Sequence, residues 1–142
     1  MTYRPIMGGA QGITVPIPKV LWGIISPIFQ VDLADKTATT AAQDAVVACR
    51  FFMAYISIKT YVVGSATVGP IFKLLVSSVT GMTTPVVVDQ ITGDNTASAT
   101  ETQAYMLMGM VPSSAGLEFF QVSVTLSGSA TIAFDTEMAA SL

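Results

Sequence analysis

The side chains that most often carry out catalysis are few in this sequence, and their spacing matches no common catalytic motif. Histidine is absent from the 142 residues, which excludes a histidine base and metal sites built on histidine. A serine–lysine hydrolase needs the order Ser-x-x-Lys, whereas Lys73 precedes Ser77. No glycine-rich phosphate-binding loop follows an expected strand. The sequence therefore predicts a protein that is not an enzyme and holds no cofactor.

Two groups of acidic residues are the remaining sources of chemistry. Asp135 and Glu137 share one face of an expected strand, and paired carboxylates cleave glycosidic bonds, although two acids near a chain end are also typical of a solvated strand terminus. The loop from Asp89 to Asp94, followed by Asn95, carries oxygen ligands for a hard cation such as Ca²⁺ but lacks the spacing of a known calcium loop. We assign no catalytic or metal residue to either group, and cation binding by the loop stays open.

The elements that position these side chains are expected to be short strands separated by turns. Apolar and polar residues alternate over 28–33 and 120–126, a period of two that is typical of a strand with one buried face. The run 45–63 is rich in β-branched and aromatic residues, as in a strand or a bent pair of strands. The segment 35–44 predicts a short helix or a loop. Further strands are expected over 72–79, 86–91, 105–111 and 132–134.

The last two strands are expected to form a hairpin, because Ser127-Gly128-Ser129 places a turn between two alternating segments. A similar pattern occurs 64 residues earlier, where Gly64-Ser65-Ala66-Thr67-Val68 corresponds to 128–132. Shared hairpin geometry and internal duplication both explain this repeat. Seven or eight strands with almost no helix predict an all-β fold, an antiparallel β-sandwich of jelly-roll or immunoglobulin-like topology.

The N-terminal residues 1–18 predict an extended arm, followed by a single β-sandwich domain over 19–142. The arm contains three prolines and three glycines, which oppose a helix. At ~3.3 Å per residue it reaches about 60 Å, long enough to lie across a neighbouring subunit. The chain start does not resemble a signal peptide and no apolar run is long enough to span a bilayer. We therefore expect synthesis in a host cytoplasm, no membrane association, and a buried, unreactive Cys49.

Charge is scarce, which favours a subunit of an assembly over a solitary molecule. Six basic and nine acidic residues make up 11% of the chain, whereas 51% is hydrophobic; an ordinary soluble domain has about 25% charged residues. The six basic side chains are scattered along a chain of net charge −3. They form no basic patch that could bind the phosphates of a nucleic acid. All six basic residues lie at or before position 73, and six of the nine acidic residues lie after it. If the fold keeps these two parts on different surfaces, subunits can be oriented by opposite charge. Alternatively, the two parts interleave in the fold.

The segment 105–111 is apolar on both sides of its expected strand. Alternate residues from Tyr105 face one way, and the methionines between them face the other. The second side is expected to be covered by the chain itself, by the arm or by another subunit, and Trp22 is a second anchor for contacts. The residues predicted to make subunit contacts are Tyr3, Arg4, Pro5, Ile6, Trp22, Met106, Met108 and Met110.

A charge-poor β-protein of this size with a Pro/Gly-rich arm resembles the decoration, or cement, proteins on the heads of tailed bacteriophages. The arm 1–18 and the segment Phe119–Glu137 carry the resemblance. It implies a virion protein on the capsid surface that forms a homo-oligomer, a dimer or a trimer, and bridges neighbouring copies of the major capsid protein. A tail or neck component of the same particle and a carbohydrate-binding β-sandwich used for host adhesion are the alternatives.

Overall fold

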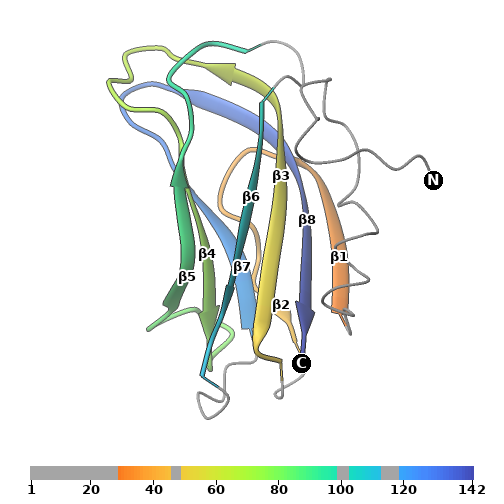
Figure 1. Ribbon diagram of the computed structural model, residues 1–142. Helices are drawn as coiled ribbons and strands as arrows, with labels where there is room; N and C mark the ends of the chain where they lie inside the picture. The colour runs from red at the N-terminus through yellow and green to blue at the C-terminus, as the bar shows by residue number, and fades with distance from the viewer. Residues whose placement is uncertain (1–28, 46–48, 99–102, 113–118) are drawn as a thin grey trace, which may run out of the picture.

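The computed structural model describes residues 29–45, 49–98, 103–112 and 119–142, which form two four-stranded antiparallel sheets packed face to face (Figure 1). The β-sandwich expected from the alternating segments is confirmed, and no described residue is helical. The strands are β1 (Phe29–Lys36), β2 (Gln43–Asp44), β3 (Phe51–Val62), β4 (Ile71–Ser77), β5 (Val86–Thr92), β6 (Gln103–Met110), β7 (Phe119–Thr125) and β8 (Thr131–Ser141).

The order of the strands identifies a jelly roll. The two sheets run β1-β8-β3-β6 and β2-β7-β4-β5. Within them β1 pairs with β8, β2 with β7, β3 with β6 and β4 with β5, all antiparallel. In this nested pattern the first strand pairs with the last, the second with the last but one, and so on, as in a long antiparallel hairpin. When the hairpin wraps around the core, β3 also pairs with β8 and β4 with β7. Eight strands wound in this way form a jelly roll, which excludes the immunoglobulin-like alternative.

The segment 35–44 contains no helix. Its first two residues end β1, its last two form β2, and the loop prediction is correct for the residues between them. The segment leaves β1 through Asp35, whose φ of 53° lies in the left-handed region, and runs beside β7. The Thr40 hydroxyl accepts the Val122 N–H at 3.0 Å and donates to the Val122 carbonyl at 3.2 Å. Thr39 makes the same type of contact with Val124. These side chains compete with a helix by bonding the neighbouring strand.

The predicted hairpin over 120–134 is wrong, because β7 and β8 lie in different sheets. The turn at Gly128 instead carries the chain across the sandwich, as the turn at Gly64 does between β3 and β4. Both glycines have a φ of 56°. The Ser65 and Ser129 hydroxyls each accept the other residue's N–H at 3.0 Å. The 64-residue repeat therefore marks two equivalent corners that bond to each other.

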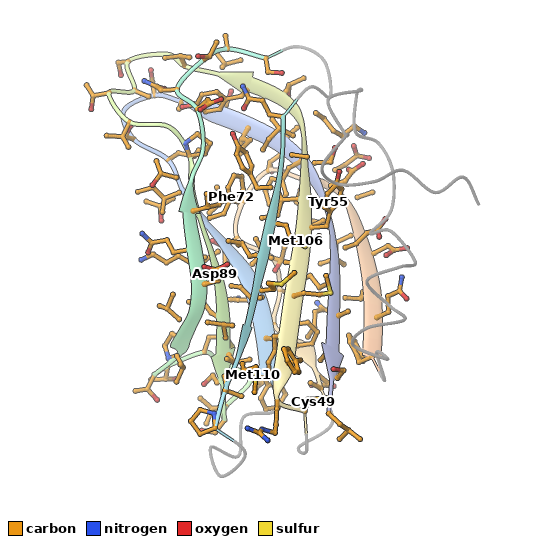
Figure 2. The ribbon with its side chains drawn as sticks, viewed as in Figure 1. Cys49, Tyr55, Phe72, Asp89, Met106 and Met110 are labelled. Carbon is orange, nitrogen blue, oxygen red and sulfur yellow. The ribbon has the colours of Figure 1, made fainter. Side chains whose placement is uncertain are left out.

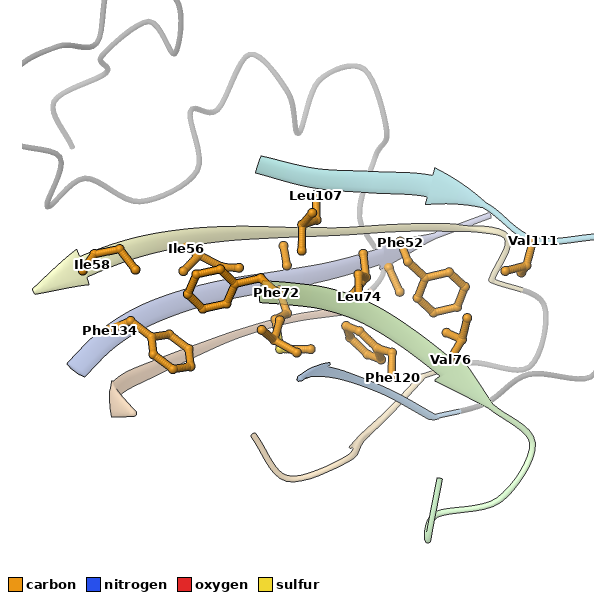
Figure 3. Close-up of a cluster of buried hydrophobic side chains, with 14 of the residues drawn as sticks. Phe52, Ile56, Ile58, Phe72, Leu74, Val76, Leu107, Val111, Phe120 and Phe134 are labelled. Atoms are coloured by element: carbon orange, nitrogen blue, oxygen red, sulfur yellow. The ribbon is translucent and has the colours of Figure 1, made fainter. Parts of the chain in front are cut away.

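The core lies between the sheets and is built on phenylalanine rings from both (Figure 3). Phe72 of β4 meets Phe134 of β8 at 5.5 Å between ring centroids, and Phe120 of β7 meets Phe52 of β3 at 5.4 Å. Edge-to-face and tilted pairs at such distances are favourable beyond their buried area. The alternation of the sequence thus places these rings on the inner face of each strand.

Two buried threonines are expected to respond in opposite directions to the same substitution. The Thr136 hydroxyl is buried and has no hydrogen-bond partner, so Thr136→Val should raise the free energy of unfolding by about 1 kcal/mol. Thr40→Val leaves the Val122 N–H without its acceptor. This substitution should therefore lower the free energy of unfolding by about 2 kcal/mol. Urea unfolding of both variants measures the pair; a loss of stability in Thr136→Val would contradict the assignment.

Candidate functional site

The methionine side of β6 is the surface where the sequence predicted subunit contacts. Leu107 and Val111 are buried in the core, and Met106, Met108 and Met110 project from the opposite, outer face of the sheet, as the alternation predicted (Figure 2). β6 forms one edge of its sheet. The role of the methionines as a subunit contact stays a prediction.

The outer face divides into a closed part and an open part. In the closed part Met53, Tyr55 and Ala139 are at most 5% exposed within the single chain, and Met106 packs against them. In the open part Met108 and Met110 are 47% and 53% exposed. Only these last two methionines are thus open for contact with another molecule.

The exposed end of β6 is joined to β5, the edge strand of the other sheet. The Asp89 carboxylate accepts the Met108 N–H at 3.1 Å. Gly109 permits a close approach of the two strands, because a Cβ at this position would lie 2.7 Å from Val88 Cγ1 and 3.0 Å from the Val88 carbonyl oxygen. The two edge strands are therefore in direct contact along this side of the sandwich.

Four exposed apolar side chains lie on these two strands, because Val86, Val87, Met108 and Met110 are each 44–53% exposed. The register places them on different faces. Val86 lies opposite Val76 of the core, and Val87 lies opposite Leu75, on the outer face of its sheet. Met108 and Met110 project from the outer face of the other sheet. The one charged residue on β5 and β6 is Asp89, and its carboxylate accepts two backbone N–H groups, one of them from Gln90 at 2.9 Å.

One member of the acidic pair near the C-terminus, Asp135, connects β8 to β1 through a hydrogen bond. Asp135 accepts the Asp35 N–H at 2.8 Å, where β1 bulges, and Asp35 in turn binds the Lys59 ammonium at 2.6 Å. That ammonium lowers the pKa of the Asp35 carboxyl. Glu137 lies opposite Asp32 in the register of β8 and β1. Within the described part of the chain, no three His, Cys, Asp or Glu residues are grouped to hold a metal ion.

In the loop after β5, the side-chain oxygen of Asn95 is engaged by a protein donor. Tyr61 donates its hydroxyl proton to Asn95 Oδ1 at 3.0 Å, and Asn95 Nδ2 donates to the Ala66 carbonyl at 3.1 Å. Burial raises the pKa of the Tyr61 hydroxyl. The Asp94 N–H is bonded to the Tyr105 hydroxyl at 3.0 Å. These contacts hold the loop to β3 and β6.

The remaining predicted contacts lie outside the described residues. These are the arm 1–18, with its contact residues, and Trp22. Among the described charges, the interleaved alternative is the correct one, because each sheet combines strands from the basic first part and the acidic second part of the chain.

On the described surface Met108 and Met110 are exposed on one sheet face, and the Asp89 and Asp135 carboxylates bind backbone N–H groups of other segments. No helix in these residue ranges is long and apolar enough to cross a membrane. Comparison with protein-family models, with curated proteins and with solved structures finds no match to this chain.

Proposed function

We propose that this protein is a structural subunit of a virion, a decoration or cement protein that sits on the capsid surface and bridges neighbouring copies of the major capsid protein. The observation that carries the proposal is a pair of half-exposed methionines, Met108 and Met110, on the outer face of a jelly roll whose sequence contains only 11% charged residues. Jelly rolls recur in viral capsid proteins and in lectins. Exposed methionines suit a contact with protein better than a contact with sugar.

The mechanism is passive and depends on repetition. Each subunit adds buried contact area between shell proteins and so raises the barrier to rupture of the shell. An individual contact can be weak, because a subunit held at one point meets the next partner at a high effective concentration. In the described part of the chain, Met108 and Met110 are the side chains best suited to this role, since an unbranched thioether adapts to an irregular partner surface.

The carbohydrate-binding alternative is less well supported by the described aromatic residues. Tyr55 and Tyr61 are at most 5% exposed, so neither presents a ring on which a sugar could stack. Tyr105 is partly buried and its hydroxyl is bonded to the Asp94 N–H. Strong and specific hits on a glycan array would favour adhesion over the cement role.

The proposal is tested by adding the purified chain to shells assembled from the major capsid protein of the same particle. We expect the chain to co-sediment with the shells and to raise their temperature of disruption. Deletion of 1–18 should abolish both effects if the arm and the outer sheet face act together. Unchanged binding and an unchanged oligomeric state after the deletion would contradict the role of the arm. Immunogold labelling confined to the tail or neck would instead favour that alternative.

A further inference from the structure

The middle of the outer face of the sheet β1-β8-β3-β6 is buried, although its two edges are exposed. One row of residues crosses this face in register, in the order Gln30, Ala139, Met53 and Met108. Gln30 and Met108, on the edge strands, are exposed, whereas Ala139 and Met53, on the central strands, are at most 2% exposed. Tyr55, which follows Met53 on the same side of β3, is 5% exposed. We call Met53, Tyr55 and Ala139 the closed patch.

The closed patch requires a third layer over the sheet. The two sheets turn their inner faces toward the common core, and the described side chains that pack with the closed patch, Ala104 and Met106, belong to β6 of the same sheet. Neighbours within one sheet stand beside an outward side chain and leave its tip open to solvent. Because the exposed fractions are those of a single chain, a second copy is not needed to bury the patch.

Residues 19–28 are joined directly to this face. They precede Phe29, where β1 begins at one edge of the sheet, and the next residue, Gln30, lies opposite Ala139 of the closed patch. The strand β3 is two strands away from β1, which is about 10 Å at the usual spacing, whereas ten residues span up to about 33 Å. The segment is therefore long enough to cross β8 and β3.

The other segments outside the described residues suit the closed patch less well. They are 46–48, 99–102 and 113–118, and each is held at both ends by described residues. The last two contain Glu101 and Glu118, and an apolar patch disfavours a charge. Three residues span at most about 10 Å, so 46–48 is too short to run along β3 and return.

The chemistry of residues 19–28 matches that of the closed patch. Six of the ten residues are apolar, and they include Trp22, the one tryptophan of the chain. A large aromatic ring buries about 150–250 Å² and so contributes most to such a contact. No acidic residue occurs in 1–28, whereas Asp32 and Glu137 lie opposite each other beside the closed patch. A segment whose only charge is Lys19 thus meets no like charge there.

From these observations we propose that residues 19–28 dock onto the closed patch of their own chain, with Trp22 as the apolar anchor. The segment is then a third layer of the domain, and Trp22 is a contact within the chain instead of a contact between subunits. The residues before it, 1–18, remain the arm. Met108 and Met110 lie beyond this layer and stay open to a partner. The inference goes beyond the proposed function and does not depend on it.

The test compares a thiol in the closed patch with a thiol just outside it. Met53→Cys and Met108→Cys are made separately in the full chain carrying Cys49→Ala; the two positions lie opposite each other in register but are 2% and 47% exposed. The Met53→Cys thiol should react with iodoacetamide at least about tenfold more slowly, because its reaction requires local opening. Adding Trp22→Ser should raise the Met53→Cys rate about tenfold and leave the Met108→Cys rate unchanged.

Tyr3→Ser is the matched control in the arm and should leave both rates unchanged, and Trp22→Phe, which keeps an aromatic ring, should retain most of the protection. Acrylamide quenching of Trp22 fluorescence needs no substitution and should be weaker in the folded chain than in urea.

Four results would each overturn the proposal. They are equal reaction rates of the two thiols, no effect of Trp22→Ser on the Met53→Cys rate, and a Trp22 that is quenched in the folded chain as fully as in urea. The fourth is a protection of the Met53→Cys thiol that is lost on dilution, because a second copy would then cover the closed patch.

Discussion

Substitution of Gly128 by alanine should lower the free energy of unfolding by about 3–5 kcal/mol, a loss large enough to threaten a domain of ordinary stability. The left-handed φ of 56° costs a residue with a Cβ about 1–2 kcal/mol. The new Cβ would also lie 2.6–2.7 Å from Ser65 Oγ and from the Ser65 backbone. Gly64→Ala should act similarly, because its Cβ would meet Ser129 in the same way. Thermal and urea unfolding measure both effects.

Two further variants separate the causes of this loss. Gly81→Ala is the control, because a Cβ there meets nothing closer than 3.6 Å and the residue has no left-handed φ; it should change the free energy of unfolding by less than about 1 kcal/mol. Gly128→Asn tolerates the left-handed φ better but keeps the Cβ. If asparagine restored most of the stability, the close approach of the two corners would not be the main cause.

Much of the fold could be predicted because alternating or β-branched apolar runs between turn residues mark the strands. The segments 86–91, 105–111 and 120–126 coincide with β5, β6 and β7 to within about two residues. The pairing of the last two strands could not be predicted in this way. A short turn with a left-handed glycine suits a hairpin and a crossing between sheets equally, and the contact that decides between them comes from Ser65, far away in the sequence.

The candidate site was predictable only in part for a similar reason. Alternation correctly placed Met106, Met108 and Met110 on one side of β6, but it does not show which of them the chain buries. Met106 packs against the closed outer face, whereas Met108 and Met110 stay exposed. The contact between β5 and β6 across the sandwich is likewise a non-local feature that no local pattern reports.

Phe120→Ala is the second substitution from which we expect a large effect. The ring is fully buried and connects the sheets, because it lies 5.4 Å from both Phe29 of β1 and Phe52 of β3. Removal of a buried phenylalanine ring leaves a cavity and costs about 3–5 kcal/mol. Phe120→Leu, which refills part of the space, should recover more than half of that loss in urea unfolding.

The matched control is the preceding residue in the same strand. Phe119 is only partly buried and projects to the opposite face of β7, so Phe119→Ala should cost clearly less than Phe120→Ala, about 1–2 kcal/mol. Because a shift of one residue in a strand exchanges its two faces, equal losses in the two variants would contradict the register of β7. The difference between the two losses of stability therefore tests which face of β7 lies in the core.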